Sequence, residues 1–300
     1  MNISIAGCGS WADYTHLPCI KKYGKVNVIS CADININNAK NLSNKFNIPL
    51  YFPDYNEMLE KTSPDAVICL VSANAVAKVA SDILKNYPVM LEKPPGNTVE
   101  ETNMIFEAAK KSGKTHMVAF NRRFAPAYLK VKEIISENKE DIKYINYKMH
   151  RIKRHNSDFE TTAIHAIDTV RFLADCDFKR VEIKYQEMPQ LGKNVANYFI
   201  FFEFTNGIYA TAEILVSTGE LSESCEIHTK AGENIYRASL PMGKTATDEE
   251  HYISQGFYNE HKHFYECLAG GKNPGNGADT AVQSVAVSNA LKNRENLIIF

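Results

Sequence analysis

The chain has 300 residues, which corresponds to about two domains at roughly 150 residues each. Apolar residues make up 44% and charged residues 23% of the sequence, so the composition is that of a globular protein and excludes a disordered one. A formal net charge of -1 gives no attraction to nucleic acid or to an anionic membrane. No apolar run in the sequence approaches the roughly 20 residues that cross a bilayer. We therefore expect neither nucleic acid nor a membrane as a partner.

The seven cysteines are an odd number, and none belongs to a C-x-x-C pair. Cys8, Cys31 and Cys69 stand at the ends of apolar runs, where small buried thiols are common. This pattern favours a reducing compartment over a disulfide framework and argues against a zinc site. The first residues enter a strand directly, without the basic and apolar regions of a secretory signal. We expect a cytoplasmic protein with no structural metal.

Up to about residue 120, short apolar segments alternate with segments of helical spacing. The expected strands are Asn2–Ala6, Val26–Ala32, Ala66–Val71, Val89–Glu92 and Met117–Phe120. The expected helices are Asn37–Phe46, Val76–Asn86 and Val99–Ser112. This alternation is typical of βαβ units in a parallel sheet that is covered on both faces. The sequence predicts a Rossmann-type, doubly wound α/β domain that binds a dinucleotide over residues 1–120.

Beyond residue 120 the pattern changes to longer strands with hairpin turns. Tyr198–Phe204 and Ile208–Val216 flank an Asn206-Gly207 pair, which supplies the positive φ angles of a tight turn. Three helices and a second hairpin are expected around them: Thr161–Leu173, His261–Ala269, Ala278–Lys292, and Cys225–Lys230 joined to Ile235–Ser239 through Ala231–Asn234. We predict an α+β domain over residues 121–300 with a large, mostly antiparallel sheet, which binds substrate and mediates oligomerisation.

The segment Tyr198–Phe202 is apolar at every position, whereas a strand with one solvated face alternates. Either a helix or a second subunit is expected to cover the other face. An open apolar sheet face is typical of an interface, so the second subunit is favoured. This favours a homodimer or homotetramer formed through the C-terminal sheet.

A glycine-rich segment, Gly7–Ala12, follows the first strand, and we call it the glycine turn. Gly7 permits the turn, Gly9 lets the backbone approach a pyrophosphate, and Ala12 allows close packing of helix on strand. Ser10 and Trp11 complete the turn, and the helix that follows presents free N–H groups to phosphates. The alternative is a turn that binds nothing.

Asp33 ends the second strand, about 20 residues after the glycine turn, where a carboxylate can bind a ribose 2′-hydroxyl. The same carboxylate would repel the 2′-phosphate of NADP, and the next residues, Ile34–Ile36, include no arginine to compensate. The sequence therefore favours NAD over NADP. The alternative for Asp33 is a residue that only caps a loop.

Lys93 follows the strand Val89–Glu92, and ligands of open α/β sheets bind at the carboxyl ends of the strands. A lysine there can hydrogen-bond a substrate hydroxyl and stabilise the alkoxide that develops during hydride transfer. Pro94 favours an extended backbone at Lys93. The alternative is a solvated lysine at the end of a strand.

Taken together, these motifs resemble the Gfo/Idh/MocA oxidoreductases, the family of glucose–fructose oxidoreductase and inositol dehydrogenase. The resemblance spans residues 1 to about 175 and rests on four motifs in the family's order: Gly7-x-Gly9-x-x-Ala12, Glu92-Lys93-Pro94 with Glu100 downstream, Asn121-Arg122-Arg123-Phe124, and His165-Ala166-Ile167-Asp168. It implies pyridine-nucleotide redox chemistry on sugars, polyols or related small molecules. It also implies that Ser72, Asn74 and Glu92 contact the cofactor.

Three polar residues, Thr161, His165 and Asp168, are spaced i, i+4 and i+7 on one predicted helix face. A histidine can accept the hydroxyl proton during alcohol oxidation, because its pKa lies near neutrality. Asp168 is suited to orient the ring or to bind a substrate hydroxyl. A histidine beside an apolar stripe is more often a core residue, but the resemblance assigns the catalytic role to His165.

Two positions depart from the family pattern. Many dehydrogenases of this family carry an aspartate where this chain has Thr161, so Lys93 lacks that counter-charge and its pKa is expected to be lower than with the aspartate present. Many also carry a histidine where this chain has Val76, within Ser72–Val76. The second departure affects the wall of the nicotinamide pocket more than the chemistry.

The segment His150–His155 is basic and precedes the helix that carries His165. Together with Arg122 and Arg123, this segment, which includes Arg154, offers a basic rim that could bind a carboxylate or phosphate, which arginine holds with two hydrogen bonds. The substrate would then be an anion: a sugar acid, sugar phosphate or nucleotide sugar. The alternative is a solvated edge strand whose charges block aggregation.

The leading hypothesis is an NAD-dependent dehydrogenase or ketoreductase for a secondary alcohol or ketone, with Lys93 and His165 handling the hydroxyl proton. A second hypothesis is a lyase or glycosidase that uses bound NAD for transient oxidation, which leaves no net NADH. A third is a non-catalytic sensor of a dinucleotide or sugar, which Thr161 makes conceivable and which retention of Lys93 and His165 argues against.

Overall fold

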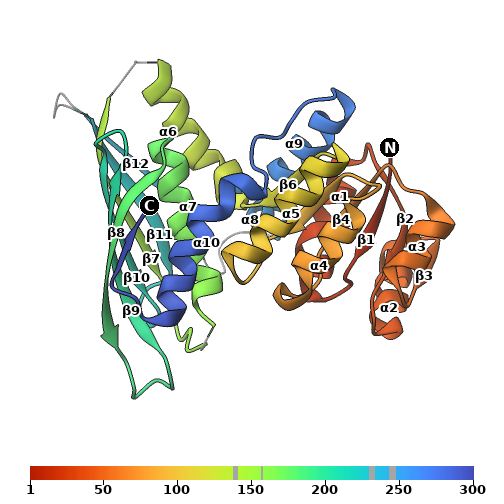
Figure 1. Ribbon diagram of the computed structural model, residues 1–300, viewed down its shortest axis with the longest axis horizontal. Coiled ribbons are helices and arrows are strands. Elements are labelled where there is room, and N and C mark those ends of the chain that lie inside the picture. Colours follow the sequence, from red (N-terminus) through yellow and green to blue (C-terminus); the bar gives the residue numbers. More distant parts are fainter. Residues whose placement is uncertain (138–140, 157, 230–233, 243–247) are drawn as a thin grey trace. The chain divides into compact units, whose positions relative to one another are not determined.

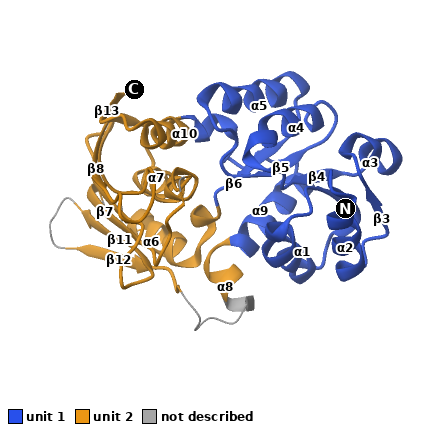
Figure 2. Cartoon of the chain, turned by 90° about the horizontal axis from the view of Figure 1, so that it is seen from below, with its two compact units in different colours: residues 1–120, 257–282 blue, residues 121–256, 283–300 orange. Residues whose placement is uncertain are grey.

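The computed structural model describes residues 1–300 except 138–140, 157, 230–233 and 243–247. The chain divides into two compact units (Figure 2). Unit 1 comprises residues 1–120 and 257–282, and unit 2 comprises residues 121–256 and 283–300. The chain thus leaves unit 1 after residue 120 and returns to it for residues 257–282, a stretch of 26 residues that was expected in the second domain.

Unit 1 is built on a sheet of six parallel strands. They are β1 (Asn2–Ala6), β2 (Asn27–Ala32), β3 (Leu50–Phe52), β4 (Ala66–Cys69), β5 (Val89–Glu92) and β6 (His116–Ala119). Their order in the sheet, β3-β2-β1-β4-β5-β6, is the order of a Rossmann fold, and its topology reverses between β1 and β4. Every residue of β4 is buried, which is why its sequence is a continuous apolar run. The predicted doubly wound fold is confirmed.

Helices cover both faces of this sheet, with α4 and α5 on one side and α1, α2 and α9 on the other (Figure 2). Their bounds are as follows: a π-helical turn η1 (Ala12–His16), α1 (Leu17–Tyr23), α2 (Ile36–Phe46), α3 (Tyr55–Thr62), α4 (Ala73–Ile83), α5 (Val99–Ser112) and α9 (Phe257–Ala269). The sequence analysis missed β3 and α3. It predicted α9 but not that this helix packs against α1 in the first unit.

Unit 2 is built on a seven-stranded sheet. Its strands are β7 (Ile142–His150), β8 (Phe178–Glu187), β9 (Ala196–Phe204), β10 (Tyr209–Leu215), β11 (Ser222–Thr229), β12 (Ile235–Ser239) and β13 (Leu297–Ile299). They lie in the order β12-β11-β7-β10-β9-β8-β13, and all neighbours are antiparallel except β7 and β10. The predicted α+β unit with a mostly antiparallel sheet is confirmed.

One face of this sheet packs against helices (Figure 1). The helices and short turns of unit 2 are η2 (Asn121–Phe124), α6 (Pro126–Glu137), α7 (Glu160–Ala174), α8 (Asp248–Ser254) and most of α10 (Ala278–Asn293). Residues 163–170 of α7 are all buried, because the helix lies between the sheet and its neighbouring helices. His165 and Asp168 are therefore core positions as well as candidate site residues.

The alternate residues of β9 face opposite sides of the sheet. Tyr198, Ile200 and Phe202 belong to the core, whereas Phe201 is 44% exposed on the other side. In the described part of unit 2, no helix covers this second face, as Figure 1 shows. Of the two covers that the sequence analysis weighed, the helix is excluded within the described residues of the single chain.

The β9–β10 hairpin forms as predicted, but its turn differs. The Gly207 N–H donates to the Phe204 carbonyl at 3.1 Å, and the Phe204 N–H donates to the Ile208 carbonyl at 3.0 Å. Only Gly207 has a positive φ (83°); Asn206 does not. This is a three-residue loop with glycine in the left-handed position, rather than a turn with both central residues at positive φ. The β11–β12 hairpin also forms, and most of its connection lies outside the described residues.

No helix among the described residues is both long enough and apolar enough to span a membrane.

Candidate active site

The glycine turn connects β1 to η1 and approaches the neighbouring strand closely. Gly7 has a φ of +98°, and a Cβ atom at this position would lie 2.5 Å from the backbone carbon of Leu70. Only glycine fits there, because both the angle and the space exclude a side chain. A Cβ at Gly9 would meet nothing within 4 Å, so the backbone there is open to a ligand. Ala12 is buried, in agreement with its predicted packing role.

Asp33 lies directly after β2 and contacts the glycine turn. Its Oδ2 accepts the Cys8 N–H at 2.8 Å, and its Oδ1 accepts the Asn35 N–H at 2.9 Å. These two bonds fix the carboxylate at the edge of the sheet next to the turn. Asp33 therefore does cap a loop, and it also faces the cavity described next.

A cavity of about 320 Å³ opens at the carboxyl ends of the strands in unit 1. Gly7, Gly9, Asp33 and Ser72 line it, together with the apolar residues Ala6, Ala32, Ile34, Pro53, Leu70, Val71, Ala75 and Val79 and with Asp54 and Tyr55. A largely apolar site with a carboxylate beside the glycine turn and an exposed glycine backbone suits the adenosine half of a dinucleotide. The residues present thus fit NAD.

The other predicted cofactor residues lie around this cavity rather than in its lining. Ser10 is exposed on the turn. Asn74, at the start of α4, accepts a hydrogen bond at 3.0 Å from Asn97 Nδ2. Trp11 is 46% exposed, with its ring edge-on to Phe257 at a centroid distance of 5.6 Å.

The Glu92 carboxylate joins the glycine turn to Lys93. Its Oε1 accepts the indole N–H of Trp11 at 2.9 Å, and its Oε2 accepts the Lys93 backbone N–H at 3.0 Å. Lys93 itself is partly exposed, and the peptide bond that follows it, Lys93-Pro94, is cis. Thus the end of β5 is held against the turn through a single carboxylate.

Two buried histidines and a buried tyrosine continue from Glu92, and the sequence analysis missed all three. His16 Nε2 lies 2.9 Å from Glu92 Oε1, His16 Nδ1 lies 2.8 Å from His261 Nε2, and His261 Nδ1 lies 3.1 Å from the Tyr265 hydroxyl. His16 and His261 are 245 residues apart, so no local pattern links them. Only the position of His16 at the end of η1, close to the glycine turn, was visible in the sequence.

His165 lies on α7 and is 9% exposed. Its backbone carbonyl accepts a hydrogen bond from Thr169 Oγ1 at 2.6 Å. Thr161, one turn earlier, is partly exposed, and its hydroxyl donates to the Asp158 carbonyl at 2.9 Å. The hydroxyl of Thr161 therefore bonds within the first turn of the helix.

Asp168 is buried and forms a two-point ion pair with Arg123. Arg123 Nε lies 2.8 Å from one carboxylate oxygen and Nη2 lies 2.6 Å from the other, which also accepts Ser284 Oγ at 3.2 Å. Such pairs are strong and directional. This pairing favours a structural role for both residues over the predicted contacts with substrate.

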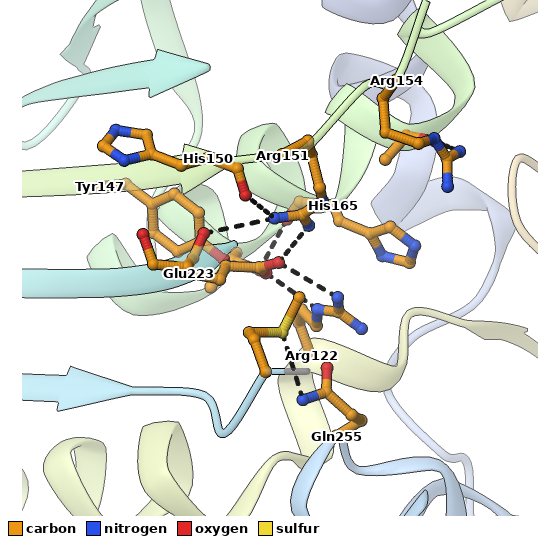
Figure 3. A network of polar contacts seen from close by, with 12 residues as sticks. Arg122, Tyr147, His150, Arg151, Arg154, His165, Glu223 and Gln255 are labelled. Atoms are coloured by element: carbon orange, nitrogen blue, oxygen red, sulfur yellow. Dashed lines mark hydrogen bonds and ion pairs between the residues drawn. The ribbon is translucent and has the colours of Figure 1, made fainter. Parts of the chain in front are cut away.

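Arg122 is likewise held by a buried carboxylate, that of Glu223 on β11. Figure 3 shows Glu223 between the guanidinium groups of Arg122 and Arg151, with Tyr147 on the same carboxylate. Burial acts to raise the pKa of Glu223, but the two arginines and the hydrogen bonds outweigh it and lower the pKa to about 2. No motif marked Glu223 as a partner of Arg122, which lies 101 residues away in the chain.

The basic segment His150–His155 is not an edge strand. Its first residue ends β7, which lies between β11 and β10 in the sheet, so the solvated-edge interpretation of the sequence is wrong. Arg151 is buried, whereas Arg154 remains exposed with one weak contact, at 3.4 Å, to Thr162 Oγ1. Of the predicted basic rim, Arg122, Arg123 and Arg151 are buried, whereas Lys153, Arg154 and His155 are exposed.

Comparisons with known proteins agree with this geometry. Residues 1–120 match the profile of the family described as "Oxidoreductase family, NAD-binding Rossmann fold". The inositol 2-dehydrogenase of Salmonella typhimurium is 24% identical over 270 residues, which cover 83% of this chain and 80% of that protein. Among solved structures, a probable dehydrogenase from Thermotoga maritima superposes with a TM-score of 0.87 at 16% identity, covering 100% of this chain and 98% of that one. GenD2 from gentamicin A biosynthesis, solved in complex with NAD, superposes with a TM-score of 0.85 at 14% identity, covering 100% and 96%.

Proposed function

The chain belongs to the Gfo/Idh/MocA oxidoreductase family, and from that premise we propose that it oxidises a secondary alcohol of a polyol or sugar with NAD, or reduces the corresponding ketone. Membership of the family accounts for an NAD-binding oxidoreductase. What we propose beyond it is the class of substrate and the residues that transfer the hydroxyl proton. Relatives that are inositol 2-dehydrogenases support a polyol.

The observation that carries the proposal is the bridge made by Glu92. It ties Lys93 to Trp11 of the glycine turn, so the lysine backbone and the cofactor turn are fixed at one edge of one sheet. A lysine held at this edge supports a role at the reacting end of the dinucleotide.

The proposed oxidation removes one hydride from carbon and one proton from oxygen in total. Bound NAD supplies the hydride acceptor for the carbinol carbon. The Lys93 ammonium hydrogen-bonds the hydroxyl oxygen and stabilises the negative charge that develops on it as the C–H bond breaks. His165 accepts the hydroxyl proton and returns it in the reverse direction. Asp168 is not assigned a chemical step, because Arg123 and Ser284 occupy its oxygens.

The internal pairing of the arginines bears on the substrate. Arg122 and Arg123 each hold a buried carboxylate of the protein, whereas Lys153, Arg154 and His155 are the exposed members of the predicted basic rim. The two buried arginines are thus engaged in internal ion pairs rather than directed at an anionic ligand. This pairing favours a neutral polyol or sugar over a sugar acid, sugar phosphate or nucleotide sugar.

The test is net NADH formation with a panel of inositols, sugars, sugar acids and nucleotide sugars, using wild type, Lys93→Met and His165→Asn. We expect NADH with neutral polyols and a large loss of kcat in both variants. Transient oxidation would consume substrate without net NADH and would assign the chain to lyase or glycosidase chemistry. Binding of NADH without turnover of any compound would favour the sensor.

We also propose that two or four copies associate through the open face of the unit 2 sheet. Phe199 and Phe201 of β9 lie on this face, and Phe201 is 44% exposed in the single chain. Exposed aromatic rings on a sheet face are typical of an interface. Light scattering after size exclusion should give a dimer or tetramer, and Phe201→Lys should reduce the mass to that of a monomer, 33.7 kDa. A wild-type monomer at high concentration would refute the association.

A further inference from the structure

The Glu92 carboxylate imposes a direction on the hydrogen bonds that lead away from it. An ionised carboxylate only accepts hydrogen bonds, so His16 Nε2, at 2.9 Å, must carry a hydrogen. With His16 as a neutral imidazole, which has one N–H, its Nδ1 is an acceptor. His261 Nε2, at 2.8 Å, must then donate to it. His261 Nδ1 becomes an acceptor in turn, and the Tyr265 hydroxyl, at 3.1 Å, donates to it.

The charge states of the groups agree with this single direction. Burial acts to raise the pKa of Glu92, but the hydrogen bonds from His16 and Trp11 and the charge of Lys93 act to lower it, and the pKa lies below its ordinary value. Burial lowers the pKa of His261 well below its ordinary value, which keeps the ring neutral. Burial also raises the pKa of Tyr265 well above its ordinary value, so the hydroxyl keeps its proton.

The hydrogen-bonded residues His16, His261 and Tyr265 are enclosed by the helices that pack around them. His16 is fully buried at the end of η1, and His261 and Tyr265 lie i, i+4 on the inner face of α9. Phe257 contacts the His16 ring at a centroid distance of 6.5 Å, and Tyr23 contacts the Tyr265 ring at 5.3 Å. The other titratable groups nearby are Cys19 on α1 and Glu260 on α9, both buried. Water therefore does not replace a lost partner at low cost.

We propose that Tyr265, His261 and His16 form a one-way hydrogen-bond chain that holds the Glu92 carboxylate against the Lys93 backbone, which makes them positioning residues for the reaction at Lys93. The inference rests on the proposed role of Lys93. It assigns a function to α9, the helix that the chain contributes to unit 1 after residue 256. No atom of the three residues needs to touch substrate or cofactor.

The Tyr265 hydroxyl, the donor farthest from Glu92, can be removed without changing any residue that contacts Glu92. In Tyr265→Phe the ring is kept, but His261 Nδ1 loses its donor, so the N–H of His261 is free to shift to that atom. His261 Nε2 then becomes an acceptor, and His16 gains an alternative to donating to Glu92. The carboxylate loses a fixed partner, although no residue near Lys93 has changed.

The matched control is Tyr23→Phe. It removes the same oxygen atom from the neighbouring ring, which stacks against Tyr265 but bonds to neither histidine. For Tyr265→Phe we expect kcat for polyol oxidation to fall about tenfold, which corresponds to one interaction of ordinary strength. KM and the Kd for NADH should change less than about threefold. Tyr23→Phe should leave all three values near those of wild type.

A readout independent of turnover is the ¹⁵N NMR spectrum of the histidine ring nitrogens in the whole protein. In wild type at neutral pH, His16 and His261 should both be Nε2–H tautomers, and Tyr265→Phe should shift one or both toward Nδ1–H. His16→Gln, whose amide N–H can still reach Glu92, should retain more activity than His16→Leu. If no polyol is oxidised, the proposed function fails, but the histidine tautomers still test the direction of the hydrogen bonds from Tyr265 to Glu92.

Three results would overturn the inference. The first is an Nδ1–H tautomer of either histidine in wild type. The second is a kcat for Tyr265→Phe equal to that of Tyr23→Phe. The third is a fall in kcat without any change of tautomer, because the effect would then arise from packing.

Discussion

In unit 1 the Glu92 carboxylate bonds to Trp11 of the glycine turn and to the Lys93 backbone, whereas in unit 2 the Glu223 carboxylate bonds to Arg122, Arg151 and Tyr147. Both carboxylates are largely buried, and both hold distant segments together. Glu92 also bonds to the buried His16, but its other two partners, Lys93 and Trp11, are partly exposed and stand at the cofactor turn, where they can contact a ligand. The partners of Glu223, in contrast, are all buried inside the protein.

The difference shows how a functional motif can mislead. Two adjacent arginines are residues expected to bind an anionic substrate. Here Arg123 pairs with Asp168, and Arg122 pairs with Glu223. Charged residues therefore indicate a binding site only when their partners have been accounted for. The following predictions test this contrast between a site carboxylate and a structural one, from the largest effect to the smallest.

Lys93→Met should lower kcat about a thousandfold, because the substrate oxygen loses a charged hydrogen-bond donor as negative charge develops on it. The free energy of unfolding should change by less than about 0.5 kcal/mol, since the lysine is partly exposed. Steady-state kinetics and urea unfolding measure the two quantities. Lys111→Met, on the exposed side of α5, is the control for the loss of a lysine. Turnover near the wild-type rate would remove Lys93 from the mechanism.

Glu223→Gln should lower the free energy of unfolding by about 3 kcal/mol, because Arg122 and Arg151 are left buried without a counter-charge. Urea unfolding measures this, and the Kd for NADH should not change. Glu57→Gln is the matched control: it breaks an exposed pair with Lys61, and the free energy of unfolding should stay close to that of wild type. A loss below about 1 kcal/mol in Glu223→Gln would show that the arginines are solvated.

The same pair predicts a dependence of stability on pH. The pKa of Glu223 is about 2 in the folded protein and near 4.5 for an unperturbed glutamate, so the folded state binds the proton more weakly. The carboxylate contributes its stability fully above pH 4.5, and this contribution is lost as the pH falls toward 2. Unfolding curves of wild type and Glu223→Gln should therefore converge between pH 4.5 and 2. A constant gap across this window would contradict the assignment.

Asp33→Ser should raise the affinity for NADPH relative to NADH about tenfold, because removal of the carboxylate removes its repulsion of a 2′-phosphate. Fluorescence titration with both cofactors gives the ratio. Asp54→Ser removes another carboxylate that lines the same cavity, and Ser retains a helix-capping oxygen for α3. An unchanged ratio in Asp33→Ser, or an equal change in Asp54→Ser, would show that Asp33 does not select the cofactor.

Local patterns predicted most of the fold. Continuous apolar runs and helical spacing located five of the six strands of unit 1 and gave β1, β5 and α5 with their observed bounds. The strand β3 escaped because it has only three residues, of which Leu50 and Tyr51 are exposed. The return of the chain to unit 1 was not predicted either, because the spacing of apolar residues in α9 predicts a helix but not the surface against which it packs.

The candidate site could be predicted only where it is local in sequence. Gly7, Gly9 and Asp33 were identified because glycine geometry and the spacing to the second strand leave a local trace. The partners that decide the roles of the other residues are remote. His261 lies 245 residues from His16, and Glu223 lies 101 from Arg122. Such pairings depend on the folded topology, and a single sequence carries no periodic signal for them.

The return of residues 257–282 to unit 1 has a consequence for biosynthesis. A ribosome has made the whole parallel sheet by residue 120, yet α1 then lacks the helix that packs against it, and His16 lacks its partner His261. The nascent cofactor unit must wait for about 140 further residues before its last helix emerges. A fragment cut at residue 120 would expose the apolar surface of α1, so the cofactor-binding half of this enzyme should not be separable by simple truncation.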